Sequence, residues 1–319
     1  AILGVSLATA KAEANSRQQF FYEYVRELSP ELPDPLLPMP MCNLINGGKH
    51  AAGSTDIQEF MVLPVGAESF SQAVRMVAEV FQALKGVLVR RGYGTTVGDE
   101  GGFAPRVKRG NKEALELLSE AVEKAGYRVG VDVAYGVDVA ANEIHNDGTY
   151  MLKTENKKLT ADEMIEYYTA LIKEFPLISI EDGLFEDDWE GWSKLQERLG
   201  DEVQLVGDDF LVTNSLYLNR AIEEKSANAI LVKPNQVGTL TESIEAVIFA
   251  KNANWGTILS HRSGETEDTT IAHLAVGLAS GQIKTGSMSR SDRVAKYNEL
   301  LRIEELLGNE AKLAKWGNS

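Results

Sequence analysis

Leu177-Ile-Ser-Ile-Glu-Asp182 is the first of five similar stretches in which a short apolar run ends in a charged residue. Successive end residues are 23 to 28 residues apart, which is the length of one strand, one helix and two short loops. Such a repeat predicts a parallel α/β barrel with its functional side chains at the carboxyl ends of the strands. The end residues are Glu181, Asp208, Lys233, His261 and Lys284.

The length and composition fit one such barrel with additional elements. The chain has 319 residues, 44% of them hydrophobic and 25% charged, and one α/β barrel takes about 250 residues. The net charge of −15 argues against nucleic acid or an anionic membrane as a direct partner. No apolar run approaches the roughly 18 residues of a membrane-spanning helix. The single cysteine, Cys42, excludes an internal disulfide and agrees with a reducing compartment.

The region before the five stretches predicts further elements. Apolar residues follow a helical period over residues 1–28, and five prolines between Ser29 and Pro40 exclude a helix or a central strand there. Two strands, Met41–Ile45 and Glu59–Leu63, are joined too closely for a helical crossover, so they should be antiparallel. We expect helices at 69–91, 111–125, 160–174 (capped by Thr160 with Glu163) and 290–306, and a strand at 131–140.

Three acidic residues are candidates for a metal site. Asp138, Glu181 and Asp208 follow three successive predicted strands, so their carboxylates should converge at one end of the barrel. Converging carboxylates repel one another unless a cation neutralises them, and oxygen ligands favour Mg²⁺ or Mn²⁺ over Zn²⁺. For any one of them alone, an exposed loop acid or a helix cap is the commoner role. The motif Asp-Val-Ala occurs twice, so spacing alone leaves Asp132 open as the alternative to Asp138.

Two lysines end predicted strands. Lys233 and Lys284 follow apolar runs, so both side chains should point into the same end of the barrel. Two neighbouring ammonium groups close to divalent cations lower each other's pKa, which would make a neutral lysine available as a base. The alternative for each lysine is a structural ion pair with one of the carboxylates.

Ser260-His-Arg-Ser-Gly-Glu-Thr-Glu-Asp268 predicts a phosphate site. The Arg262 guanidinium offers two parallel donors, Ser263 adds a hydroxyl group, and the amino terminus of the following helix favours an anion. The alternative is a capped loop in which Arg262 pairs with a surface carboxylate. The glycine-rich loop Asn46-Gly-Gly-Lys-His-Ala-Ala-Gly53 is suited to movement over such a site.

Together these motifs resemble those of the enolases, the phosphopyruvate hydratases of glycolysis. The matches run from Ala1 to about Glu305 in the family's order. They are Asn46-Gly-Gly-Lys-His50, Gln58-Glu-Phe-Met61, Gly98-Asp-Glu-Gly-Gly-Phe-Ala-Pro105, Ser179-Ile-Glu-Asp182, Gly207-Asp-Asp209, Val232-Lys-Pro-Asn-Gln-Val-Gly-Thr239, Ser260 to Asp268, and Ile283-Lys-Thr-Gly286.

The resemblance implies an α/β fold, an enolase-type TIM-like barrel that starts with an antiparallel strand pair, in the order ββαα(βα)6. Residues 33–319 would form this catalytic barrel. Residues 1–32 would be the helical end of the family's N-terminal α+β domain plus a proline-rich linker. We expect the chain to lack the rest of that domain, which in the family contributes to the dimer contact.

The resemblance also implies a reaction, the Mg²⁺-dependent dehydration of 2-phospho-D-glycerate to phosphoenolpyruvate. Asp138, preferred over Asp132 because Ala141-Asn-Glu143 follows it, would bind Mg²⁺ together with Glu181 and Asp208. The complete enzyme would hold two Mg²⁺ ions in each active site. A serine of the N-terminal domain would help to bind the second ion, which the substrate carries. A lysine base working beside Mg²⁺ is the general pattern of the enolase superfamily.

By the same resemblance, Lys233 would be the base. Glu100 would be the general acid for the departing hydroxide, with Glu59 beside it in both catalysis and substrate binding. Lys284 would bind the substrate carboxylate and lower the pKa of Lys233.

The remaining roles implied by the resemblance concern substrate binding. Arg262 and Ser263 would bind the phosphate. His261 would take part in catalysis, and it would close over the site together with the loop of His50.

Two alternatives to an enolase stay open. One is another Mg²⁺-dependent member of the superfamily, such as an acid-sugar dehydratase, although the phosphate cluster and Gly98–Pro105 argue against it. The other is a protein that acts mainly through protein partners, as some enolases do with plasminogen or in RNA degradation. The family implies a cytoplasmic location with a secondary presence at the cell surface, and a homodimer or higher homo-oligomer when complete.

Overall fold

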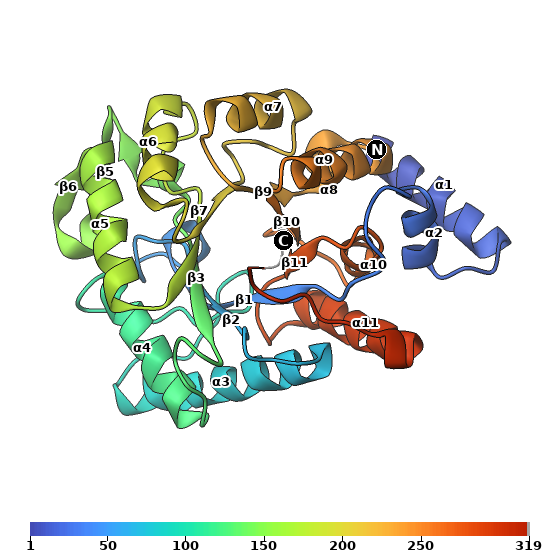
Figure 1. Cartoon of the computed structure of the whole chain (residues 1–319). Coiled ribbons are helices and arrows are strands. Elements are labelled where there is room, and N and C mark those ends of the chain that lie inside the picture. Colours follow the sequence, from blue (N-terminus) through green and yellow to red (C-terminus); the bar gives the residue numbers. More distant parts are fainter. Residues whose placement is uncertain (318–319) are drawn as a thin grey trace.

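A computed structural model describes residues 1–317 of the chain. Eight strands close into one barrel in the order β1-β11-β10-β9-β8-β7-β3-β2, and helices surround the ring of strands (Figure 1). The predicted α/β barrel is therefore confirmed. Its strands are β1 Met39–Asn46, β2 Glu59–Leu63, β3 Ala134–Asp138, β7 Leu177–Glu181, β8 Gln204–Gly207, β9 Ala229–Val232, β10 Gly256–Ser260 and β11 Gly281–Lys284.

The order of the elements is also the predicted one. Two strands are followed by two helices and then by six strand–helix units, which is ββαα(βα)6. No helix within residues 1–317 has both the length and the apolar character needed to cross a membrane. The barrel helices are α3 Phe70–Arg90, α4 Asn111–Lys124, α5 Ala161–Glu174, α6 Trp189–Leu199, α7 Ser215–Glu224, α8 Pro234–Val237, α9 Leu240–Asn252, α10 Thr270–Gly277 and α11 Ser291–Leu307.

The strand β2 runs against both of its neighbours. It is antiparallel to β1, as predicted, and also to β3, whereas the other neighbouring strands are parallel. The expectation that no central strand would include Pro40 is wrong, because β1 begins at Met39 and Pro40 pairs with Ile283 of β11. The hydrogen-bonded pairing of β1 with β2 begins only at Cys42, so the missing N–H of Pro40 does not interrupt that pairing.

Two helices precede the barrel where the sequence predicted one. They are α1 Ile2–Ser16 and α2 Phe21–Glu27, and Gln18 between them has a φ of +56°, a backbone conformation that ends a helix. Both helices lie outside α9 and α10 at the edge of the molecule (Figure 1). The Leu240 amide donates a hydrogen bond to the Ser6 hydroxyl at 3.0 Å. The division of the chain at residues 32 and 33 stays a prediction.

A small antiparallel sheet between β3 and α5 was not predicted. Its strands are β4 His145–Asn146, β5 Thr149–Leu152 and β6 Lys157–Leu159. The Thr154 amide donates to both carboxylate oxygens of Asp56, at 3.2 and 3.0 Å, and so connects this region to the loop after β1. The predicted strand at 131–140 is shorter, since β3 covers only Ala134–Asp138. Short 3-10 turns occur at η1 Gly48–His50, η2 Ala141–Glu143, η3 Lys153–Glu155 and η4 Gly308–Glu310.

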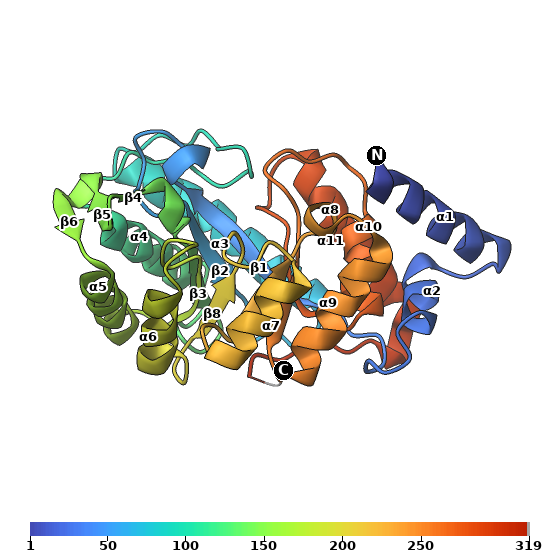
Figure 2. The same ribbon diagram turned by 90° about the horizontal axis from the view of Figure 1, so that it is seen from above.

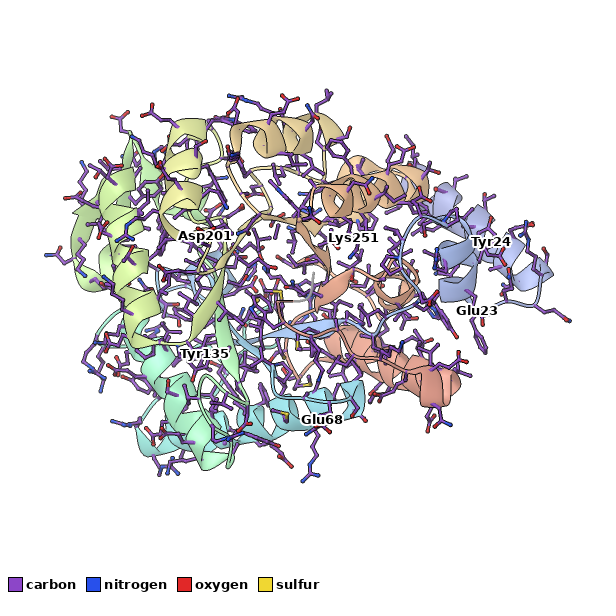
Figure 3. The ribbon with its side chains drawn as sticks, viewed as in Figure 1. Glu23, Tyr24, Glu68, Tyr135, Asp201 and Lys251 are labelled. Carbon is purple, nitrogen blue, oxygen red and sulfur yellow. The ribbon has the colours of Figure 1, made fainter. Side chains whose placement is uncertain are left out.

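Apolar side chains fill two layers of the barrel. Outside the strands, residues such as Tyr135 point toward the helices, and the Tyr135 hydroxyl donates to the Ser119 hydroxyl of α4 at 3.0 Å (Figure 3). Inside the strands, a separate cluster closes the barrel below the polar strand ends. This inner cluster comprises Met41, Met61, Leu63, Val206, Ala229, Leu231 and Ile258.

The predicted cap of α5 is confirmed and can be tested. The Glu163 amide donates to the Thr160 hydroxyl at 3.3 Å, and the Thr160 amide donates to the Glu163 carboxylate at 2.8 Å. Replacing Thr160 with Ala should lower the free energy of unfolding by about 1 kcal/mol, because the helix loses this cap. Urea unfolding followed by circular dichroism measures the change. Thr160→Ser keeps the hydroxyl and should stay close to wild type, so an equal loss in both variants would contradict the capping role.

Candidate active site

The predicted site residues gather at the carboxyl ends of the parallel strands, which we call the barrel mouth. In Figure 2 the loops that follow the strands lie on the side of the molecule opposite to the end of the described chain. Because β2 is antiparallel, its first residue, Glu59, lies at this same edge. Asp138, Glu181 and Lys284 are the last residues of β3, β7 and β11, and Asp208, Lys233 and His261 directly follow β8, β9 and β10.

Lys284 lies among the carboxylates of the mouth. Its ammonium donates to Asp138 Oδ2 at 2.9 Å and to Glu181 Oε1 at 2.8 Å, and it lies 3.3 Å from Glu59 Oε1. Burial lowers the pKa of Lys284, but the surrounding carboxylates outweigh burial and raise the pKa well above its ordinary value. Lys284 is therefore a permanent buried cation in this arrangement.

Lys233 forms a second ion pair, with Asp208 Oδ2 at 2.5 Å. Burial lowers the pKa of Lys233, but the charges of Asp208 and Glu181 and the hydrogen bond to Asp208 leave it raised. The predicted lowering of this pKa concerns two lysines beside divalent cations, so it stays a prediction; among the described residues alone, the nearby carboxylates outweigh the one neighbouring ammonium. Lys284 does act in the predicted direction and lowers the pKa of Lys233. The sequence left two roles open for each lysine, a neutral base or a structural ion pair, and in this structure both lysines form ion pairs with carboxylates.

Glu59 and Glu100 form a buried pair on the other side of the mouth. Asn43 donates to Glu100 Oε2 at 3.1 Å, and His261 Nε2 lies 3.3 Å from Glu100 Oε1. His50 Nδ1 lies 3.6 Å from Glu59 Oε1 and 3.9 Å from Glu100 Oε1. Two carboxylates thus face two imidazoles in a space with almost no exposure to solvent.

The environments of the two glutamates push their pKa values apart. Burial and the charge of Glu100 raise the pKa of Glu59 well above its ordinary value. Burial also raises the pKa of Glu100, but His261, Lys284 and His50 outweigh burial and leave that pKa well below its ordinary value. Glu59 therefore holds a proton more readily than Glu100 does.

Arg262 and Ser263 lie at the edge of the mouth, in the loop after β10. The Arg262 guanidinium donates to the Asn235 side chain at 3.1 Å and makes no ion pair with any residue among 1–317. The Ser263 hydroxyl lies 2.9 Å from His50 Nε2, which brings the loop of η1 over this edge. A half-buried guanidinium without a carboxylate partner can bind an external anion.

Several carboxylate oxygens of the mouth are buried but accept no hydrogen bond from the described residues. They are Glu181 Oε2, Asp208 Oδ1 and Glu59 Oε2. Buried charged oxygens need a partner, so these orphaned oxygens suit a hard divalent cation.

The predicted ligand set is not assembled as a tight cluster. Lys284 binds one oxygen each of Asp138 and Glu181, and Lys233 binds one oxygen of Asp208, so the lysines hold part of the predicted ligand set. Within the described chain, two groups of potential ligands have atoms that all lie within 4.8 Å of one another. They are Asp182 with Asp208 and Asp209, and His50 with Glu59 and Glu100.

The structure separates the two aspartates that the sequence left as alternatives. Asp132 lies outside the barrel and accepts hydrogen bonds from the Arg128 guanidinium at 2.9 and 2.8 Å. These hydrogen bonds lower the pKa of Asp132 to about 2. Asp138 instead shares Lys284 with Glu181, so only Asp138 belongs to the mouth.

Three residues of the site were not predicted. Asn43 lies inside β1 and Arg293 inside α11, and no local pattern marks either of them. Asp182 had a signal, because it directly follows Glu181 at a strand end. It accepts the backbone N–H groups of Asp208 and Asp209, each at 2.8 Å, and so holds the chain that presents Asp208.

A model of the family described as "Enolase, C-terminal TIM barrel domain" matches residues 34–318. The match includes all eight barrel strands and every residue of the candidate site. The acidic groups at the mouth, with their unpartnered oxygens, are compatible with divalent metal binding.

Replacing Asp208 with Asn should weaken the binding of a divalent cation by about tenfold or more, because the site loses one ligand charge. Mn²⁺ serves as the probe, and electron paramagnetic resonance measures the free ion. Asp132→Asn is the matched control, since Asp132 lies outside the mouth, and it should bind Mn²⁺ as wild type does. Equal affinities in the two variants would contradict a cation site that includes Asp208.

Proposed function

The chain belongs to the family of enolase C-terminal TIM barrel domains. From this premise we propose that it catalyses the Mg²⁺-dependent dehydration of 2-phospho-D-glycerate to phosphoenolpyruvate. The reaction removes a proton beside a carboxylate and expels hydroxide from the neighbouring carbon. One observation carries the proposal: a lysine, a glutamate pair and a set of carboxylates face one another at the barrel mouth. We propose the cytoplasm and glycolysis as its setting.

The lysines supply the base and a countercharge for the substrate. Lys284 is a buried cation, so it suits the carboxylate of the substrate, where negative charge accumulates as the proton leaves. Release of the Lys233–Asp208 ion pair would lower the pKa of Lys233, because Asp208 is one of the charges that raise it. The free amine could then accept the proton.

The metal ligands would be Asp138, Glu181 and Asp208. A divalent cation bound there supplies positive charge that stabilises the negative charge developing on the substrate carboxylate. Their all-oxygen ligand set suits Mg²⁺.

The glutamate pair would act on the face of the substrate opposite to the base. Glu59 lies on β2 and Lys233 follows β9, and these strands are four positions apart in either direction around the eight-stranded ring. Base and acid would therefore act from opposite sides, which favours loss of the proton and the hydroxide in an anti arrangement. Glu59 favours the protonated form, so the proton for the departing hydroxide would come from Glu59 and would reach it by way of the Glu100 carboxylate, which leaves Glu59 ionised.

The phosphate would bind at the edge of the mouth. Arg262 has no carboxylate partner among the described residues, and Ser263 offers a hydroxyl group beside it. His50 contacts Ser263 from the loop of η1, so binding of a phosphate there would draw this loop over the substrate.

The first test is the formation of phosphoenolpyruvate from 2-phospho-D-glycerate by the 319-residue chain across a Mg²⁺ titration. We expect turnover that depends on Mg²⁺ and stops when a chelator is added. Ultraviolet absorbance measures the product, and a panel of acid sugars serves as the control. Turnover of an acid sugar alone, or neither binding nor turnover of 2-phospho-D-glycerate, would contradict the proposal.

The roles of base and acid can be separated. Lys233→Ala and Glu100→Gln should each reduce turnover by about 1,000-fold. In D₂O, Lys233→Ala should also lose exchange of the substrate proton beside the carboxylate, whereas Glu100→Gln should keep it, since only the later step is blocked. Proton NMR measures the exchange. Lys251→Ala, which lies on α9 away from the mouth, is the control; exchange retained in Lys233→Ala would exclude Lys233 as the base.

A further inference from the structure

Arg293 is a fully buried cation that the proposed mechanism does not use. It lies in the first turn of α11 and has 0% of its surface exposed. A buried guanidinium is costly unless its donors are satisfied. The partners of Arg293 therefore indicate what the residue is there to hold.

Nε of Arg293 lies 3.1 Å from Asp292 Oδ2 of the same helix, and the partners of its two terminal nitrogens belong to two loops of the barrel mouth. One terminal nitrogen contacts His261 Nδ1 and donates to the Arg262 carbonyl at 2.7 Å. The other donates to the Ser263 carbonyl at 2.7 Å and to the Asp99 carbonyl at 3.2 Å. The guanidinium thus joins the loop that carries His261, Arg262 and Ser263 to the loop that carries Glu100.

The contact with His261 has a chemical consequence. A guanidinium has only donors, so His261 Nδ1 must accept, and the proton of the neutral imidazole must lie on Nε2. That nitrogen is the one 3.3 Å from Glu100 Oε1. Burial lowers the pKa of His261, and the charge of Arg293 acts in the same direction against the pull of Glu100, so the neutral ring is favoured.

The surroundings of Arg293 leave its side chain little freedom. Gly286 has a φ of +82°, and a side-chain carbon placed there would lie 2.7 Å from Arg293 Cδ and 2.9 Å from the Glu100 carbonyl. The Ser287 amide donates to that same carbonyl at 2.9 Å. The segment after β11 therefore fits closely against both Arg293 and the Glu100 loop.

We propose that Arg293 is a positioning residue that keeps His261 in its Nε2-protonated form and aims that N–H at the Glu100 carboxylate. The proposal rests on the proposed function, which assigns Glu100 to the delivery of the proton to the departing hydroxide. Without Arg293, His261 would be free to carry its proton on Nδ1 and to present a lone pair, not a donor, to Glu100.

Nitrogen-15 NMR of the four histidines tests the tautomer directly, with His261→Gln to assign the signal. In wild type the His261 shifts should be those of a single Nε2-protonated ring. Arg293→Met should give a mixture of tautomers and reduce turnover of 2-phospho-D-glycerate by about 100-fold. Arg293→Lys keeps a charged donor, so its turnover should fall less than that of Arg293→Met. Arg302→Met, an exposed arginine of the same helix, is the control and should behave as wild type.

Unchanged His261 shifts and turnover in a folded Arg293→Met variant would overturn the proposal. If that variant fails to fold, Arg293→Lys decides, because reduced turnover with wild-type His261 shifts would show that Arg293 only stabilises the fold. The NMR measurement needs no substrate. A chain that does not dehydrate 2-phospho-D-glycerate but shows the expected change of tautomer would refute the proposed function and leave the positioning of His261 standing.

Discussion

The mouth of this barrel depends on neutralising an excess of buried negative charge. Glu59, Asp138, Glu181 and Asp208 each have less than a tenth of their surface exposed. Removing a carboxylate from water costs several kcal/mol, and the cost is recovered only when a cation or several donors lie against it. Lys284 contacts three of these carboxylates from the end of β11, and a closed ring of strands is what brings β2, β3 and β7 within its reach.

The antiparallel start of the barrel serves the same charge balance. In a parallel strand the last residue reaches the mouth, whereas in β2 it is the first residue, Glu59, that does so. The loop before β2 therefore also lies at the mouth and can present His50 beside Glu59. One reversed strand thus adds both a carboxylate and an imidazole on the side of the ring opposite to Lys233.

Most of the barrel could be predicted from the sequence, because apolar runs at a regular interval end in charged residues such as Glu181 and Lys284. Features that depend on the backbone conformation of one residue, or on one contact between distant residues, could not be predicted from the sequence. The break at Gln18 and the small sheet fastened through Asp56 are of this kind. The ion pairs of the lysines are of the same kind: spacing places two lysines near one another, but only the packed structure shows which carboxylates pair with them.

The glutamate pair shows how packing turns identical side chains into different chemical groups. Glu59 and Glu100 are both buried, yet the pKa of Glu59 is raised and that of Glu100 is lowered. The difference arises because His261, Lys284 and His50 lower the pKa of Glu100, whereas the charge of Glu100 raises that of Glu59. The pair is therefore asymmetric, because Glu59 holds a proton more readily than Glu100 does. His261 contributes to this asymmetry, so in the proposed mechanism the buried contact between His261 and Arg293 belongs to the acid side of the site.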